Sequence, residues 1–344
     1  MFNRILVPLD GSPRAEKAIP VAARIARASG GTVRLMQVVT LPIDNNPYLA
    51  GSYLARPIDF NGQVMEQDIN RATTYLERLA NSAQLAGITI EIEVPVGMPA
   101  PVILSAVYAQ QVDLVVMCSH GDTGFRRWIL GSVAQKVTRH SPVPVLVLRE
   151  DGLVPAGGKA TRILVALDGS ALAESVLAPA AQLSIALSAP APGALHLIRV
   201  LRRLVREGDR HADSAIEAAE RRAAADVQGY LDAAAHRLCT GELARLNFSV
   251  TSSLVFDSNV PGTLIDIAEK GEHLGDGIEN WCDVIALATH GRGGPQRWLM
   301  GSVTERVLGF TGLPLLIVRP ALADAEQEVA RKAVSETQGW VGLL

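Results

Sequence analysis

The chain contains two copies of one sequence plan. The segment Ile5–Ser12 (ILVPLDGS) returns as Ile163–Ser170 (ILVALDGS), and an arginine precedes each copy. Near the end of each copy, Pro144–Arg149 (PVLVLR) returns as Pro314–Arg319 (PLLIVR). A repeat on this scale, in a chain of 344 residues, predicts two similar domains. We place the first domain at residues 1–150 and the second at residues 161–320, with a linker at 151–160 between them. A tail of unassigned function follows at residues 321–344.

Within a copy, apolar runs alternate with helical stretches. The apolar runs of the first copy indicate five strands, at residues 5–9, 33–39, 89–95, 114–118 and 144–148. The stretches between them indicate helices, at about residues 13–29, 66–86, 99–111 and 132–140. This alternation predicts right-handed crossovers and a parallel sheet with helices on both faces. The expected fold class is α/β, with two Rossmann-like or flavodoxin-like domains of five parallel strands each.

Composition supports this fold and excludes several functions. Hydrophobic residues make up 48% of the chain and aromatic residues only 4%, which suits an aliphatic core of buried parallel strands. A net charge of -3 gives no reason to expect a nucleic-acid partner. The three cysteines are too few and too scattered for a disulfide framework or a zinc site, which favours a reducing compartment.

The apolar segments also predict where the protein resides. A strand begins almost directly after Met1, which leaves no room for a signal peptide. No uninterrupted apolar run approaches the roughly 18 residues that suggest a membrane span. We therefore expect a soluble, cytoplasmic protein with no membrane partner.

Three segments depart from the repeated plan. Residues 42–64 hold several Pro, Gly and Asn and predict a long loop, either a lid over the site or an irregular surface loop. The polar stretch Gly271–Trp281 is the expected source of the extra residues in the second copy. Residues 204–238, with clustered Arg, Glu and Ala, predict a solvated amphipathic helix.

Asp10 and Asp168 each follow an apolar strand and precede Gly-Ser. Ligands of such sheets bind outside the carboxyl ends of the strands, where a carboxylate can accept hydrogen bonds from ribose hydroxyls or an adenine amino group. The alternative is that Asp-Gly-Ser only makes the turn into a helix, with Ser12 or Ser170 as N-cap and Pro13 at the first helical position. The caps explain the serines better, whereas both interpretations of the aspartates stay open.

A glycine loop recurs as well. Gly121 stands nine residues before Gly131-Ser132-Val133, and Gly291 stands nine residues before Gly301-Ser302-Val303. Glycines that permit close approach, followed by a helix N-terminus, suit an anionic phosphate group. A competing explanation is a capping box, because Ser132 to Gln135 and Ser302 to Glu305 have the required spacing.

Other loop residues carry weaker signals. Four arginines could bind phosphate oxygens, although a solvated role is favoured for each: Arg126, Arg127, Arg292 and Arg297. Trp128 and Trp298 are expected to pack the loops, and His120 and His290 to hold the turns rather than to transfer protons. The chain has no P-loop, no G-x-S-x-G elbow and no histidine pair with metal-ligand spacing.

These motifs resemble those of the universal stress protein family. The features that carry the resemblance are the Asp-Gly-Ser turn, the Ser/Thr-His-Gly turn, the nine-residue gap, Gly-Ser-Val and the closing strand, and they span nearly all of residues 1–150 and 161–320. The resemblance implies a tandem member of the family, with the Rossmann-like fold also found in adenine nucleotide alpha hydrolases. One branch of the family binds ATP through a Gly-x2-Gly-x9-Gly-Ser/Thr signature.

The resemblance assigns site residues in both copies. In the first copy, Asp10 and Val38 would contact adenine and ribose, and the phosphates would lie against Gly121, Gly131, Ser132 and Val133. In the second copy the same roles fall to Asp168, Val200, Gly291, Gly301, Ser302 and Val303. The first signature glycine is replaced by Cys118 in one copy and Ala288 in the other. The second copy also has Arg292-Gly293-Gly294 in its loop and Ala166 in place of Pro8, so we expect the two sites either to differ in affinity or to include one that stays empty. The assignment includes no catalytic residue and no metal ligand.

The resemblance also implies partners. Family members pair domains through their last strands, which would make an internal pseudo-dimer from residues 144–149 and 314–319, with a homodimer of whole chains left open.

Two functions remain open. The leading hypothesis is a cytoplasmic stress-response regulator that binds ATP, ADP or AMP, with Mg²⁺ as an optional companion. Its hydrolysis would be slow or absent, because neither loop offers a base beyond Asp122. The alternative is a nucleotide-free interaction scaffold, which Cys118 and Ala288 favour. An adenylating enzyme of similar fold is disfavoured because its Ser-Gly-Gly-x-Asp-Ser loop is missing.

Overall fold

The computed structural model describes residues 1–40, 58–119, 130–149, 158–202, 214–271, 281–289 and 300–320. The strands of the first half are β1 (Arg4–Leu9), β2 (Thr32–Gln37), β3 (Thr89–Glu93), β4 (Leu114–Cys118) and β5 (Val145–Leu148). Its helices are α1 (Pro13–Glu16), α2 (Ala18–Ser29), α3 (Ile58–Ala80), the 3-10 turn η1 (Ala83–Leu85), α4 (Pro99–Ala109) and α5 (Ser132–His140).

The second half repeats this order. Its strands are β6 (Arg162–Ala166), β7 (Gly193–Leu201), β8 (Phe248–Phe256), β9 (Val284–Ala288) and β10 (Leu315–Val318). Its helices are α6 (Ala171–Glu174), α7 (Leu177–Ser188), α8 (Ser214–Thr240), the 3-10 turn η2 (Glu242–Arg245), α9 (Val260–Lys270) and α10 (Ser302–Phe310). The α/β fold with a mostly parallel sheet, predicted from the alternation, is confirmed.

The strands of both halves join into one sheet. The order across the described residues is β3-β2-β1-β4-β5-β10-β9-β6-β7-β8. Pairs within each half are parallel, and the central pair, β5 with β10, is antiparallel with Leu146 opposite Leu316. The predicted pairing of the halves through their last strands is therefore confirmed. The helices α2 and α7 also pack together across this junction.

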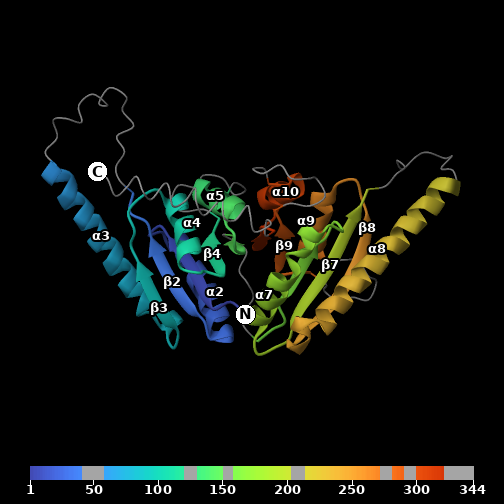
Figure 1. The fold of residues 1–344 in the computed structure, drawn as a ribbon, viewed down its shortest axis with the longest axis horizontal. Coiled ribbons are helices and arrows are strands. Elements are labelled where there is room, and N and C mark those ends of the chain that lie inside the picture. Colours follow the sequence, from blue (N-terminus) through green and yellow to red (C-terminus); the bar gives the residue numbers. More distant parts are fainter. Residues whose placement is uncertain are drawn as a thin grey trace, which may run out of the picture.

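Helices cover both faces of the sheet, so both faces are apolar. On β1, Ile5 and Val7 point into one buried cluster with α2, while Leu6 points into the other with α4. All three side chains are buried, and a fully buried aliphatic side chain contributes roughly 1.5–3 kcal/mol relative to an exposed one. The long helices α3 and α8 lie at the two outer sides of the molecule, whereas α5 and α10 lie near its centre (Figure 1). This two-sided burial explains the continuous apolar runs of the sequence.

Three expected helices differ in detail. The helix expected at 66–86 is α3, which begins at Ile58 and ends at Ala80, so the last residues of the predicted loop at 42–64 are helical. The rest of that loop, residues 42–57, lies outside the described residues. The helix expected at 13–29 is two helices, α1 and α2, with Lys17 between them.

The helix expected at residues 204–238 is α8. It was expected to be solvated, but one of its faces is buried. Val227, Leu231, Ala234 and Leu238 recur at intervals of three to four residues and join the core. Such spacing places side chains on one helix face, which is why a charged sequence can still supply a buried stripe. Gly271 ends α9 at its C-cap, and the extra residues 272–280 that follow lie outside the described part of the chain.

One helical stretch of the described residues, 171–188, is long and apolar enough to cross a membrane by composition alone. However, 56% of this stretch is buried inside the protein, where α7 packs against β6 and β7. A core position therefore accounts for its composition.

Strand order reverses once in each half. From β1 the chain moves outward to β2 and β3, then returns to the other side of β1 with β4 and β5. In parallel sheets the crevice at such a reversal, outside the carboxyl ends of the strands, is the usual position of a ligand. A ligand site is therefore expected at the ends of β1 and β4, and at the equivalent ends of β6 and β9.

Candidate functional site

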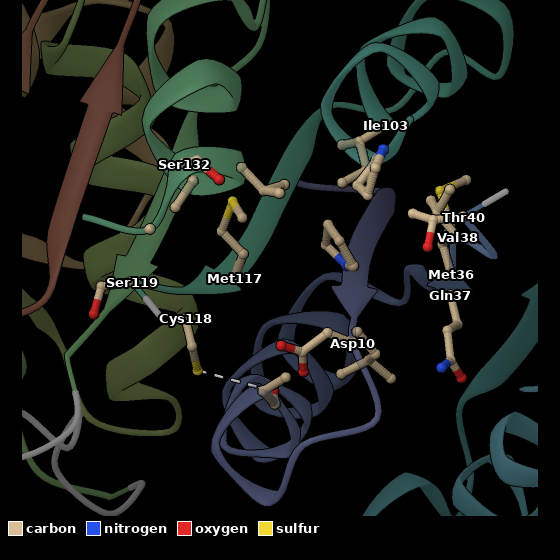
Figure 2. A pocket seen from close by; sticks show the side chains of 17 residues that line it. Asp10, Met36, Gln37, Val38, Thr40, Ile103, Met117, Cys118, Ser119 and Ser132 are labelled. Atoms are coloured by element: carbon tan, nitrogen blue, oxygen red, sulfur yellow. Dashed lines mark hydrogen bonds between the residues drawn. The ribbon is translucent and has the colours of Figure 1, made fainter. Parts of the chain in front are cut away.

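A pocket of about 330 Å³ opens at this reversal in the first half. The lining residues come from β1, β2, β4, the helices α1, α4 and α5, and the turns beside them. They are Pro8, Leu9, Asp10, Ala15, Met36, Gln37, Val38, Thr40, Pro99, Ile103, Met117, Cys118, Ser119, Gly131, Ser132, Val133 and Ala134. Figure 2 shows Asp10 and Ser132 on opposite sides of the cavity, with Met117 between them. The pocket thus unites five residues that the resemblance assigns to nucleotide binding in this copy, namely Asp10, Val38, Gly131, Ser132 and Val133.

The turn after β1 presents Asp10. Its Oδ1 accepts hydrogen bonds from the backbone N–H of Ser12, at 3.0 Å, and from the Ser12 hydroxyl, at 2.6 Å. Oγ of Ser12 in turn accepts from the N–H of Ala15 at 3.1 Å and caps α1, as the sequence predicted. Gly11 takes φ +86°, a conformation that other residues rarely adopt. The turn therefore fixes one carboxylate oxygen while Asp10 stays exposed at the pocket wall.

The turn before α5 corrects the predicted capping box. Gly131, not Ser132, is the N-cap, and Ser132 is the first helical residue. No side chain caps the helix, because a capping box requires the serine one position before the helix begins. The N–H of Gly131 donates to the carbonyl oxygen of Ser119 at 2.7 Å, so it is used within the protein. The exposed Ser132 hydroxyl and the first amides of α5 remain at the pocket, where a helix N-terminus attracts anions.

Cys118 stands at the end of β4, where the family signature has a glycine. Its Sγ donates a hydrogen bond to the carbonyl oxygen of Arg14 at 3.0 Å. Burial raises the pKa of Cys118 to about 12. The side chain is therefore a neutral thiol at pH 7 and forms a small, weakly polar part of the pocket wall.

The pocket also contains residues that the sequence did not single out. Apolar side chains from three elements face the cavity, namely Met36, Ile103 and Met117. Gln37 and Thr40 add polar groups at the end of β2. Their positions could have been derived, since the residues that close each strand and open the next helix must meet at the carboxyl edge of the sheet.

Several expected site residues cannot be placed. Gly121 and Gly291 lie outside the described residues, as do the loop arginines, tryptophans and histidines considered above. Among the residues that the structure describes, no group of three or more His, Cys, Asp or Glu side chains could hold a metal ion.

The second half repeats the local turns. Oδ1 of Asp168 accepts from the N–H and hydroxyl of Ser170, at 2.9 and 2.6 Å. Gly301 is the N-cap of α10, with Ser302 and Val303 as the first helical residues, so the capping box is absent here for the same reason. Val200 lies in β7 and is partly buried. The structure thus places the described residues of this predicted site, namely Asp168, Val200, Gly301, Ser302 and Val303, at the equivalent edge of the sheet.

The fold and this pocket define a class of protein: a two-copy, Rossmann-like α/β protein with a pocket where strand order reverses. The sequence model of the universal stress protein family matches residues 1–149 and 159–319. The chain therefore belongs to the universal stress protein family and contains two of its domains in tandem.

Individual relatives match one copy at a time. Universal stress protein YxiE of Bacillus subtilis is 30% identical over 149 residues, which cover 43% of this chain and 100% of the relative. Universal stress protein MJ0531 of Methanocaldococcus jannaschii is 29% identical over 154 residues, which cover 44% of this chain and 84% of the relative. Among solved structures, a universal stress protein from Archaeoglobus fulgidus has the same two-copy fold, with a TM-score of 0.60, 20% identity and coverage of 93% of this chain and 100% of that chain.

Proposed function

We propose that this protein is a stress-response regulator that binds ATP, ADP or AMP in the pocket of its first half. The observation that supports this most is the combination, in one pocket, of an exposed carboxylate at Asp10 and the N-terminus of α5 at Ser132. This combination suits a nucleotide, because its sugar offers hydroxyl donors and its phosphates are anionic.

The nucleoside would occupy the side of the pocket formed by β1 and β2. A cavity of about 330 Å³ lies within the range of small-molecule sites. Val38, Met36 and Ile103 offer apolar contacts to a flat base, and the Asp10 carboxylate would accept hydrogen bonds from ribose hydroxyls or the adenine amino group.

The phosphates would lie at the start of α5. The first amides of a helix have no partner within the helix, and its dipole places partial positive charge there. Ser132 adds a hydroxyl, and Gly131 leaves the approach open because it has no side chain. Gly131, Ser132 and Val133 would thus contact the phosphates, and any Mg²⁺ would bind beside them.

Hydrolysis would be slow or absent. Of the pocket residues that the structure describes, only Asp10 and Cys118 can titrate. One oxygen of Asp10 is engaged in the turn, and the raised pKa of Cys118 keeps its thiol protonated. A base that activates water must reach the reacting atoms and accept a proton; the Asp10 carboxylate would instead face the sugar, and a protonated thiol accepts no proton. Occupancy rather than turnover would then carry the signal.

A second candidate function is a nucleotide-free interaction scaffold. One observation favours it: Cys118 fills the position of a signature glycine with a side chain at the pocket wall. If this thiol blocked the ligand, the repeated turns would serve only to fold the protein.

Isothermal titration calorimetry with ATP and Mg²⁺ separates the two. We expect saturable binding, and at least tenfold weaker binding by Asp10→Asn, because hydrogen bonds to charged groups contribute about 1.5–3 kcal/mol. Asparagine keeps an oxygen for Ser12 and so preserves the turn. The matched control is Asp226→Asn, at an exposed position on α8, which should bind like the wild type. Absence of heat at millimolar ATP, with a folded protein by circular dichroism, would leave the scaffold as the function.

A further inference from the structure

The two Asp-Gly-Ser turns have the same backbone. Gly11 takes φ +86° and Gly169 takes φ +83°. Asp10 and Asp168 each use Oδ1 to accept from the serine two residues later. A difference between these two turns must therefore come from the side chains that pack against them.

Strand register identifies those side chains. Leu35 lies opposite Val7 in the first half, and Leu197 lies opposite Val165 in the second. Two residues further along each outer strand, Gln37 and Arg199 are therefore equivalent. A neutral amide in the first half is replaced by a guanidinium in the second.

The guanidinium of Arg199 packs directly against the second turn. A Cβ atom added at Gly169 would lie 2.5 Å from Nη1 and 3.0 Å from Cζ of Arg199. At Gly11 the nearest such contact is the amide nitrogen of Gln37, at 3.4 Å. Arg199 is only 8% exposed, and its guanidinium lies over the ring of Tyr230, 5.6 Å from the centroid. The cation is thus held beneath the turn by packing on two sides.

This packing changes what Asp168 can offer a ligand. Asp168 is partly buried, whereas Asp10 is exposed. A guanidinium presents five donors and no acceptor, and it binds carboxylates more strongly than a neutral hydroxyl does. A cation against this turn therefore competes with ribose hydroxyls for the oxygens of Asp168.

A second substitution reduces space on the other side of the equivalent site. Ala134, which lines the first pocket, corresponds to Thr304 at the same position of α10. Thr304 is buried, and its hydroxyl donates to the carbonyl oxygen of Ala288 at 2.9 Å. Extra atoms therefore occupy the region beside the helix N-terminus.

We propose that Arg199 makes the second half unreceptive to adenine nucleotides, so that the chain binds one nucleotide and not two. The proposal rests on the proposed function of the first pocket. Arg199 acts as a specificity-determining residue: it withdraws the Asp168 carboxylate from the ligand, while Gln37 leaves Asp10 accessible. The two copies then have unequal roles, one that responds to the nucleotide and one that does not.

The test is the binding stoichiometry of ATP, measured by equilibrium dialysis on the full chain. We expect one ATP per chain for the wild type, two for Arg199→Gln and none for the reciprocal Gln37→Arg. Asp10→Asn should weaken the wild-type binding at least tenfold, whereas Asp168→Asn should leave it unchanged. If Arg199→Gln fails to fold, the double variant Arg199→Gln/Thr304→Ala restores the side chains of the first half at both positions.

The outcomes separate the two proposals. Two ATP per wild-type chain, or one ATP in folded Arg199→Gln, would overturn the role of Arg199 while leaving nucleotide binding intact. No binding by the wild type together with none by Arg199→Gln would instead overturn the proposed function itself. Loss of binding in Asp168→Asn would assign the occupied site to the wrong half and contradict the inference.

Discussion

Arg149 donates a hydrogen bond from Nη2 to the backbone carbonyl oxygen of Leu308, which belongs to the other half of the chain. Arg319 makes the reciprocal contact, from Nη1 to the carbonyl oxygen of His140 at 3.3 Å. Each arginine follows the last strand of one half and binds the C-terminal turn of a helix in the other. Such carbonyls lack partners within their helix and carry partial negative charge, so the two cations join the halves beside the β5–β10 junction.

Arg149→Ala should therefore destabilise the protein. The variant leaves the Leu308 carbonyl unpaired at a buried position and removes the packed stem of a side chain that is 6% exposed. Burial disfavours the charged guanidinium and lowers the pKa of Arg149 to about 10. Removing this charge therefore offsets part of the lost stability. We expect the free energy of unfolding to fall by about 2 kcal/mol in urea titrations.

The matched control for this variant is Arg319→Ala. Arg319 is only partly buried, so its removal should cost less than about 1 kcal/mol. Equal losses for the two variants would contradict the unequal burial of the two contacts.

A methyl group at each glycine turn tests the packing of Arg199 without any ligand. Gly11→Ala and Gly169→Ala both force alanine into a left-handed conformation, which costs roughly 1–2 kcal/mol. Only at Gly169 would the added methyl group also lie 2.5 Å from Nη1 of Arg199. We expect Gly169→Ala to lose about 1 kcal/mol more than Gly11→Ala in thermal or urea unfolding. In an Arg199→Gln background this excess should vanish, and an excess that persisted there would place its cause elsewhere.

Cys118 should be unreactive in the folded protein. Its pKa of about 12 means a thiolate fraction at neutral pH about a thousandfold below that of an ordinary cysteine. With iodoacetamide at pH 7.5, mass spectrometry should find Cys239, which is exposed, modified long before Cys118. Modification of both at similar rates would show that the thiol is neither buried nor bonded to the Arg14 carbonyl. Protein unfolded in guanidinium provides the control, since there the two cysteines should react alike.

Stability should fall above pH 10 because of two tyrosines. Burial, together with the negative charges of Glu16 and Glu174, raises the pKa values of Tyr75 and Tyr230. In the unfolded chain their pKa is about 10. Above that pH the unfolded state releases protons that the folded state retains, so the free energy of unfolding decreases as pH rises. The double variant Tyr75→Phe/Tyr230→Phe should show a shallower decline between pH 9 and 11 than the wild type; equal slopes would contradict the shifted pKa values.

Much of the fold could be predicted from the repeat. The strand expected at residues 5–9 is observed as Arg4–Leu9, because a strand buried on both faces leaves a continuous apolar run. The start of α3 could not be predicted, since Pro, Gly and Asn before it obscure the helical period, and tertiary packing decides such cases. The capping boxes failed for a different reason: spacing identifies the motif but does not say whether the serine or the preceding glycine is the N-cap.

The site was predictable only in part. Asp10 and Ser132 could be recognised because motifs mark strand and helix ends, and the fold brings them to one pocket. The role of Arg199 could not be predicted, since nothing in the sequence shows which residue of β7 lies beside Gly169. That contact depends on the register of β6 and β7, which are separated in the sequence by two helices, and register follows from the packed sheet. The effect of exchanging Gln37 for Arg199 is therefore visible only in three dimensions.

The most direct test of nucleotide binding is a crystal structure of the full chain grown with excess ATP and Mg²⁺. The proposed function predicts electron density in the first pocket, with the sugar beside Asp10, the base against Val38 and the phosphates at the start of α5. A well-ordered first pocket closed by the protein's own side chains, without ligand density at saturating ATP, would contradict it.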